Sequence, residues 1–289
     1  MLQPFRVLTP ANIEQASAEL VRLGERATIY AGGAELILLL RYGLIHAEYL
    51  INIKGIDGLS DIGWDGQTVQ IGATVTHHRL ETDPLIRERL PLLAEAESQI
   101  ANIRVRNQGT LGGNLCFNDP HSDPGTALLL HQAEVMLASK DGLRRIPLSD
   151  FFSGMYATAL APGELLQKVF VAPLPVEWGA AYLRVHRYQR PTLNVAAAAK
   201  LRNGTVEDAR LAVGCVGPKP QRLSELEAKI RGEKLDGAKR ILADSKPYLK
   251  DKLEPVGDLL GSADYKIYMA AVLLSRALSQ AGRSNGKGG

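Results

Sequence analysis

Residues 31–36 read AGGAEL and join a short apolar run, Ala27 to Tyr30, to a leucine-rich run that begins at Leu36. The β-branched and aromatic residues before the glycines favour a strand, and the leucines after them favour a helix. Two adjacent glycines permit unusual backbone conformations at a cost in conformational entropy. The segment therefore predicts either a tight strand-to-helix turn or a turn that binds a phosphate at the start of a helix.

A second glycine-rich segment, GTLGGN, occupies residues 109–114. Backbone N–H groups of such segments converge on anions, although a simple bend explains either segment taken alone. Two of them in one chain favour a ligand whose diphosphate is held from both sides, and a flavin dinucleotide fits this better than a mononucleotide. Asp123, in HSDPG, is predicted as an N-cap, as a carboxylate for ribose hydroxyls, or as both.

The composition is that of a globular protein with enough apolar material for more than one core: 289 residues, 45% hydrophobic and 22% charged. The net charge is only +3 and basic runs with interleaved aromatics are missing, so we expect no nucleic acid partner. The apolar runs are too short to cross a bilayer, and the N-terminus shows no export signal. We therefore expect a cytoplasmic protein without a membrane span.

Standard catalytic and metal-binding motifs are missing from the sequence. It has no GxGxxG, GxxxxGK[ST], HExxH or GxSxG, which disfavours a Rossmann fold, a P-loop NTPase, a zincin and a serine hydrolase. Cys116 and Cys215 form no CxxC pair, so we expect no metal site or iron–sulfur cluster on this chain. For His77, His78 and Tyr188 we expect packing or surface roles, and we predict no catalytic acid or base.

Hydrophobic patterning and turn residues predict several elements and four parts of the chain. Thr9-Pro10 is predicted as the N-cap and first residue of the first helix. A single helical stretch is predicted around 86–99, a turn at Gly112-Gly113, and a hairpin with a type I′ turn at Asn203-Gly204. The predicted parts are an α/β unit at 1–56, an α+β unit at 57–173, a C-terminal domain at 174–283 and a flexible tail at 284–289.

Nearly the whole chain resembles the FAD-binding subunit of the molybdenum hydroxylases, the family of xanthine dehydrogenase and bacterial carbon monoxide dehydrogenase. GTLGGN in its context is the specific signal, because AGGxxL alone is weak. The resemblance implies an α+β protein: a two-subdomain FAD-binding fold of the vanillyl-alcohol oxidase (PCMH) type followed by a small α+β C-terminal domain. The segments that carry the resemblance include YAGGAELILLLR (30–41), INIKGIDGL (51–59), IGATVTHHRLE (71–81), IRVRNQGTLGGNLCFNDPHSDP (103–124) and GELLQKVFVAPLP (163–175).

The family places its FAD contacts at positions that can be carried over residue by residue. Its two glycine segments hold the diphosphate, an acidic residue contacts the adenosine side, and apolar residues and a basic one contact the flavin. The matching positions here are Ala31, Gly32, Gly33, Ala34, Glu35 and Leu36 in the first segment, Thr110, Leu111, Gly112, Gly113 and Asn114 in the second, Asp123, Ile100, Leu166 and Arg184.

Two features depart from the family pattern. Glu35 stands where a serine or threonine is common, and a carboxylate repels a diphosphate, so we expect it to point at hydroxyls or solvent. An acid in the first turn of a helix is also favoured by the helix dipole. The aryl-CoA reductase branch carries a cysteine-bearing insertion for an extra cluster, which this sequence lacks, so that branch is disfavoured.

The resemblance implies an FAD-binding electron-transfer subunit of a heterotrimeric oxidoreductase. Substrate would react on a molybdopterin-binding large subunit, and an iron–sulfur small subunit would pass electrons to this chain. The FAD would pass them to an acceptor such as NAD, a quinone or another protein. The alternative is a self-sufficient flavin-dependent oxidase or reductase of the same fold.

Overall fold

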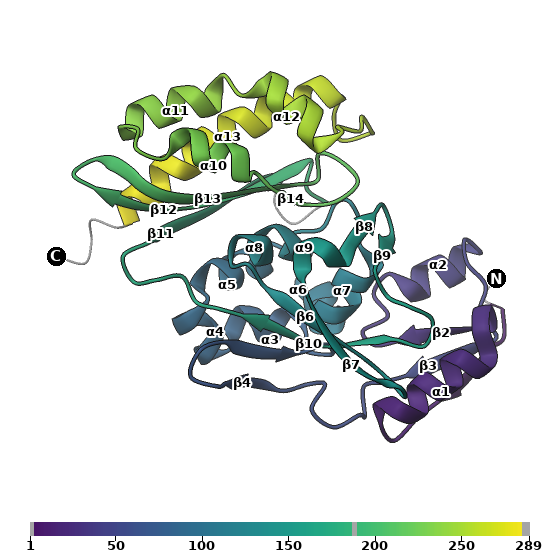
Figure 1. Cartoon of the computed structure of the whole chain (residues 1–289). Coiled ribbons are helices and arrows are strands. Elements are labelled where there is room, and N and C mark those ends of the chain that lie inside the picture. The colour runs from purple at the N-terminus through teal and green to yellow at the C-terminus, as the bar shows by residue number, and fades with distance from the viewer. Residues whose placement is uncertain (1–2, 187–189, 285–289) are drawn as a thin grey trace.

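The computed structural model describes residues 3–186 and 190–284. Figure 1 shows sheets and helices in an α+β arrangement, with a C-terminal layer stacked on a larger N-terminal part. Of the predicted tail, Ser284 ends a long helix, and 285–289 lie outside the described residues, as does Tyr188. No helix of the two described ranges is both long enough and apolar enough to span a membrane.

The N-terminal sheet is three-stranded and parallel, in the order β1-β3-β2. Side chains alternate between its faces: Leu50 packs with Leu40 on one face, and Ile51 packs with Ile13 on the other. The sheet is therefore covered by one helix on each side. Its elements are β1 (Arg6–Leu8), α1 (Ile13–Leu23), the short 3-10 helix η1 (Gly24–Arg26), β2 (Ala27–Tyr30), α2 (Leu36–Tyr42) and β3 (Tyr49–Asn52).

The predicted start of the first helix is wrong. Helix α1 begins at Ile13 rather than at Pro10, because the Asn12 side chain accepts a hydrogen bond from the Gln15 N–H at 2.9 Å and caps the helix there. Strand β2, in contrast, covers the run predicted for it before the first glycine segment.

The second sheet is antiparallel, in the order β4-β5-β10-β6-β7, and helices cover one of its faces (Figure 1). The core between them includes Val69, Leu128 and Val169. The elements of this part are β4 (Ile62–Trp64), β5 (Val69–Gly72), α3 (His77–Thr82), α4 (Pro84–Arg89), α5 (Pro91–Ser98), α6 (Ile103–Gln108), α7 (Leu111–Phe117), α8 (Pro124–Leu130), β6 (Glu134–Ser139), β7 (Gly142–Pro147), α9 (Leu148–Phe151), β8 (Phe152–Gly154), β9 (Ala157–Thr158) and β10 (Leu165–Val171).

Two predictions for this part are wrong in detail. The helical stretch around 86–99 is two helices, because Pro91 starts α5 and provides no N–H to continue α4. The second glycine segment is not a bend: Gly112 and Gly113 lie in the first turn of α7, whose N-cap is Thr110. Two adjacent glycines considered alone predict a turn, but the N-cap at Thr110 and the packing of Gly112 favour a helix.

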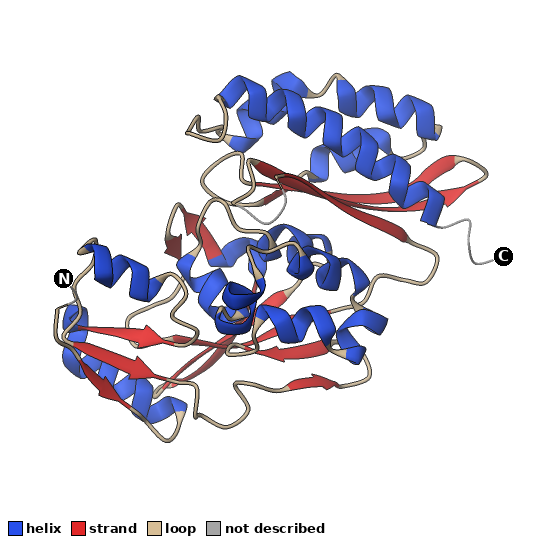
Figure 2. Cartoon of the chain, turned by 180° about the vertical axis from the view of Figure 1, so that it is seen from behind, coloured by secondary structure: helices blue, strands red, loops and turns tan. Residues whose placement is uncertain are grey.

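The C-terminal sheet is antiparallel, in the order β11-β12-β13-β14, and lies between two cores. Ala196 and Ala198 pack toward the N-terminal part, and Ala197 and Ala199 pack toward the C-terminal helices. Figure 2 shows these helices on the outer face of the sheet and the N-terminal helices beneath its inner face. The elements are β11 (Gly179–Val185), β12 (Leu193–Arg202), β13 (Thr205–Gly214), β14 (Gln221–Arg222), α10 (Ser224–Ile230), α11 (Leu235–Ala243), α12 (Lys246–Leu253) and α13 (Ala263–Ser284).

The predicted hairpin is confirmed. Strands β12 and β13 are joined at Asn203-Gly204, and both residues have positive φ, 52° and 71°, as a type I′ turn requires.

Candidate functional site

A cavity of about 440 Å³ is lined by residues of the first sheet unit, of the second unit and of the segment that precedes β12. This volume is typical of a site for a small ligand or cofactor. Of the fifteen residues predicted to contact FAD, thirteen line this cavity; Leu111 and Arg184 do not. The fold thus gathers positions from three separate stretches of the chain around one space.

The two glycine segments touch each other at this cavity. A Cβ on Gly32 would lie 2.1 Å from the Gln108 carbonyl oxygen and 3.0 Å from Gly109 Cα, so only glycine permits the approach. Residues 31–36 all line the cavity. Within the described ranges, the N–H groups of residues 33–36 donate to no acceptor. Unpaired N–H groups are costly unless water or a ligand satisfies them, so this turn is suited to an anion.

The second glycine segment meets the ligand space differently. The N–H groups of Leu111 and Gly112 donate to the carbonyls of Val75 and Ala73, each at 2.9 Å, and the Gly113 N–H donates to Thr110 Oγ1 at 3.2 Å. These groups are therefore already satisfied inside the protein. At Gly113 this segment presents backbone without a side chain, since a Cβ there would meet only Thr110 Oγ1 within 4 Å.

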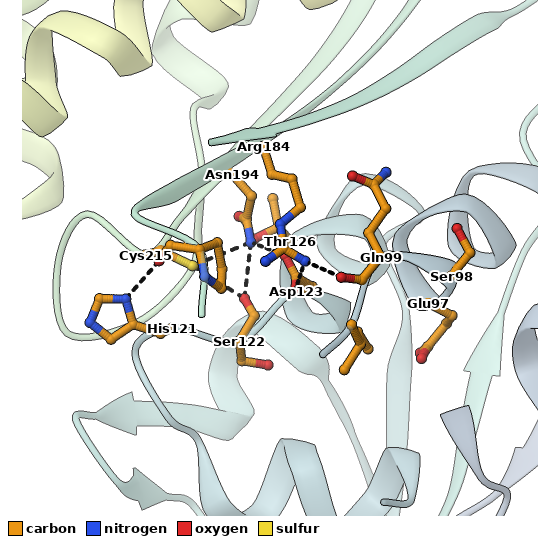
Figure 3. A network of polar contacts seen from close by, with 12 residues as sticks. Glu97, Ser98, Gln99, His121, Ser122, Asp123, Thr126, Arg184, Asn194 and Cys215 are labelled. Carbon is orange, nitrogen blue, oxygen red and sulfur yellow. Dashed lines mark hydrogen bonds and ion pairs between the residues drawn. The ribbon is translucent and has the colours of Figure 1, made fainter. Parts of the chain in front are cut away.

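Leu111 and Arg184 support the site from behind. Leu111 is fully buried in the core of the second unit. The Arg184 side chain is 1% exposed, and its Nη1 donates to Asp123 Oδ2 at 2.8 Å and to the Gln99 carbonyl at 2.5 Å. Figure 3 shows Arg184 reaching from the C-terminal sheet toward Asp123 and Gln99. Arg184 thus fixes residues beside the cavity instead of lining it.

Asp123 is a buried junction between the N-terminal part and the C-terminal sheet. Besides Arg184, its carboxylate accepts hydrogen bonds from the Tyr182 hydroxyl at 2.5 Å and from Asn194 Nδ2 at 3.0 Å. Asp123 is the N-cap residue of α8, as predicted, but its carboxylate makes no capping hydrogen bond, because these three donors occupy its oxygens. Burial raises the pKa of the Asp123 carboxyl, and the Arg184 charge opposes this rise.

The predicted apolar contacts also face the cavity. Ile100 and Leu166 line it together with Ala101, which has a positive φ of 38°. Arg106 Nη1 donates to the Ile100 carbonyl at 2.9 Å, while Arg184 holds the preceding carbonyl. Two arginines thus fix the backbone of this loop.

Each carboxylate among the lining residues has an arginine partner. Arg190 lies 3.2 Å from Glu35 and 2.7 Å from Asp119, and Arg144 lies 2.6 Å from Glu164. The hydrogen bonds from Arg144 lower the pKa of the Glu164 carboxyl. Glu35 was expected to face hydroxyls or solvent; its side chain is 42% exposed, yet it has a protein partner 155 residues away in the sequence. This pairing reduces the repulsion that a diphosphate would meet.

Sequence reasoning missed several lining residues. His77, for which we expected a packing or surface role, is buried, as packing requires, and it also lines the cavity. Gly109 could have been found from the sequence, because it belongs to the GTLGGN motif. No sequence pattern indicates Arg190, because its contacts depend on long-range folding. Cys116 also lines the cavity, but burial raises the pKa of its thiol to about 12, so it is not a reactive thiolate. The described residues contain no group of side chains suited to a metal ion.

Two protein-family models match the chain. The FAD binding domain in molybdopterin dehydrogenase matches residues 3–175, and the CO dehydrogenase flavoprotein C-terminal domain matches residues 182–281.

Medium subunits of two dehydrogenases or hydroxylases are similar to this chain over nearly its full length. The carbon monoxide dehydrogenase medium chain of Hydrogenophaga pseudoflava is 33% identical over 97% of this chain and 98% of its own. The nicotine 6-hydroxylase medium subunit of Paenarthrobacter nicotinovorans is 31% identical, with the same coverage. Among solved structures, a chain of the Hydrogenophaga pseudoflava carbon monoxide dehydrogenase has a TM-score of 0.93 at 32% identity, covering 98% of this chain and 99% of that one. A chain of quinoline 2-oxidoreductase from Pseudomonas putida 86 has a TM-score of 0.91 at 26% identity, covering 99% of both chains.

Proposed function

Because this chain belongs to the family of FAD-binding medium subunits of the molybdenum hydroxylases, we propose that it carries electrons through FAD bound in the cavity. The electrons come from iron–sulfur clusters on a small partner subunit and go to an external acceptor. A large partner subunit binds molybdopterin and the substrate. The medium-chain names of the relatives support an assembly of this kind.

The observation that carries this proposal is the contact between the two glycine segments. Gly32 packs on Gln108 and Gly109, and the N–H groups of residues 33–36 are left without acceptors in the described chain at the same cavity. A diphosphate bound there would satisfy these groups, and the arginine partners of the lining carboxylates reduce the repulsion it would meet.

The residues divide into five roles in this proposal. Residues 31–36 bind the diphosphate, and Thr110, Gly112, Gly113 and Asn114 form the opposite wall. Ile100 and Leu166 provide apolar contacts for the flavin and exclude water, and Asp123 approaches the adenosine side. Leu111 and Arg184 act as supports. When bound, FAD supplies one- and two-electron transfer, while the protein orients it and sets its electrostatic surroundings.

We further propose the domain limits read from the sequence, 1–56, 57–173 and 174–283, and a location in the cytoplasm. Cys116 and Cys215 are free thiols, which agrees with a reducing compartment.

An absorption spectrum of the purified chain tests the central proposal. We expect flavin bands in the protein, or their appearance after incubation with FAD and removal of the free cofactor. Absence of flavin after both procedures would contradict FAD binding. Flavin that stays with acid-precipitated protein would instead favour the self-sufficient, covalently flavinylated alternative. Affinity purification from the source cells should also bring down a large and a small subunit, and reduction of the bound flavin by that complex with its substrate tests the electron route.

A further inference from the structure

His77 and Glu97 form a buried ionisable pair beside the cavity. His77 is the first residue of α3, and its Nδ1 lies 2.6 Å from Glu97 Oε2, at the end of α5. The two side chains are 4% and 0% exposed. The His77 N–H also donates to the Gly109 carbonyl at 3.1 Å, which ties the pair to the second glycine segment. The Glu97 contact therefore holds the imidazole ring, and the bond of the backbone N–H to Gly109 holds the main chain that carries it.

The buried Glu97 carboxyl retains its proton to a higher pH than an exposed carboxyl would. Glu97 Oε1 is buried and has no hydrogen-bond partner among the described residues, so a fully ionised carboxylate would leave part of its charge uncompensated. Burial raises the pKa of the Glu97 carboxyl, and His77 opposes this rise. When the buried Glu97 carboxyl holds its proton it donates to Nδ1, so the neutral ring carries its hydrogen on Nε2.

The Nε2 edge of the ring lies beside the ligand space. His77 and Gly109 both line the cavity, and a Cβ on Gly109 would come within 2.9 Å of His77 Cδ2 and 3.2 Å of Nε2. No acceptor for Nε2 is found in residues 3–186 or 190–284. A side chain at position 109 would cover this edge, and glycine leaves it open.

We propose that His77 is a cofactor-binding residue whose Nε2–H donates a hydrogen bond to bound FAD, and that Glu97 is the positioning residue that holds the ring and its proton. This inference rests on the proposed function. The His77 ring adds a hydrogen-bond donor beside the second glycine segment. The N–H groups of Leu111, Gly112 and Gly113 in that segment already donate within the protein, so they are not available to the cofactor.

Other charged groups surround the pair, and each has a partner of its own. Glu81, on the same helix, pairs with Arg106 of α6 at 3.0 Å, and Asp123 pairs with Arg184 of β11 at 2.8 Å. These neighbours include both signs of charge. A change in FAD affinity with pH is therefore attributed to His77 and Glu97 only where the His77 variants differ from the wild-type chain.

Substitutions that keep or remove the N–H test the donor. His77→Phe keeps a ring without the N–H, and we expect the dissociation constant for FAD to rise about tenfold or more, the usual loss for a hydrogen bond to a charged group. His77→Gln retains an amide N–H at a similar reach and should recover part of this loss. The control is His78→Phe, on the same helix with 40% side-chain exposure, which should bind like the wild type. FAD affinity is measured by fluorescence titration on the full chain.

A pH series separates a donor from a purely structural residue. When the Glu97 carboxyl, whose pKa burial raises, loses its proton at higher pH, the ring donates through Nδ1 and Nε2 becomes an acceptor, so wild-type affinity for FAD should fall, whereas His77→Gln should show a flatter profile. Because His77→Phe leaves Glu97 without its partner, the double variant His77→Phe/Glu97→Leu keeps the test valid if the single variant unfolds. Wild-type binding of FAD with unchanged affinity in a folded His77→Phe or double variant would overturn this inference alone. Failure of the wild type to bind FAD would overturn the proposed function.

Discussion

At the scale of single residues, the neighbours Gly112 and Gly113 are glycines for different reasons. A Cβ on Gly112 would lie 2.6 Å from Ala73 Cβ and 2.7 Å from the Ala73 carbonyl oxygen, so packing inside the protein requires glycine there. A Cβ on Gly113 would meet only the Thr110 hydroxyl within 4 Å. The fold therefore demands the first glycine, and the second lies at the cavity, where we propose that close approach of the cofactor requires it.

Gly113→Val should reduce FAD affinity by about tenfold or more without unfolding the chain, because the side chain would enter the cavity instead of the core. The measurement is FAD content and affinity beside a circular dichroism melt. The matched control is Gly55→Val, at an exposed position with no atom near its Cβ and outside the cavity lining, which should retain FAD. A folded Gly113→Val chain with full flavin content would contradict the assignment of this wall.

His131 predicts a loss of stability in acid. Its Nδ1 donates to the Ala172 carbonyl at 2.9 Å, and burial lowers its pKa from 6.5 to about 4. As the pH falls below 6.5, the unfolded chain binds a proton that the folded chain refuses until about pH 4, so unfolding becomes easier across this window. The linked loss is up to about 3 kcal/mol.

Urea unfolding at a series of pH values measures this effect. His131→Gln removes the titrating ring, so its free energy of unfolding should fall less between pH 7 and pH 4 than that of the wild type. His46→Gln, at an exposed position, should keep the wild-type slope. Identical slopes for His131→Gln and wild type would show that His131 does not make this contribution.

At the scale of elements, capping and packing together decide where helices begin. Thr9-Pro10 and Asn12 both suit a helix start, but Ile13 and Ala16 belong to the core beneath the parallel sheet. The register that buries these two residues begins the helix at Ile13 and makes Asn12 its cap. A sequence pattern offers several caps, and burial of the apolar face selects one.

Asn12→Ala should therefore destabilise the chain by about 1 kcal/mol, the usual cost of losing an N-cap. Thr9→Ala removes the cap predicted from the sequence and should change the free energy of unfolding by less than about 0.5 kcal/mol. Chemical denaturation of both variants provides the comparison. A larger effect for Thr9→Ala than for Asn12→Ala would contradict the observed helix start.

At the scale of the whole molecule, Asp123 joins the N-terminal part to the C-terminal sheet. It is the N-cap residue that precedes α8, and its partners are Tyr182 and Arg184 on β11 and Asn194 on β12. Figure 3 shows Arg184 and Asn194 approaching it from the sheet. One carboxylate thus helps to position a cavity wall and to dock a layer of the fold.

Asp123→Ala should destabilise the protein by about 3–5 kcal/mol, because it removes the carboxylate partner of the buried Arg184 guanidinium. Tyr182→Phe removes one of the three donors and should cost only about 0.5–1.5 kcal/mol. Urea unfolding measures both values, and proteolysis within residues 172–178, which link the two parts, reports loosened docking. Equal effects of the two substitutions would argue against Asp123 as the junction.

Local patterns determined much of this protein. The limits of β2 and the type I′ turn at Asn203-Gly204 follow from short-range hydrogen bonding and side-chain shape, which a sequence carries directly, whereas the α+β fold was implied by the resemblance. Of the fifteen residues that the resemblance implied as FAD contacts, thirteen line one cavity, although their contact with FAD is still a prediction.

Only the tertiary structure decided which charges meet. Arg190 pairs with Glu35 across 155 residues, His77 with Glu97 between two helices, and Asp123 with donors from another sheet. It also converted the predicted second turn into a helix, because Gly112 packs against Ala73. A sequence fixes the propensity of each segment, but the energy of an ion pair or a buried N–H depends on distance and burial. These quantities exist only once the sheets and helices have packed.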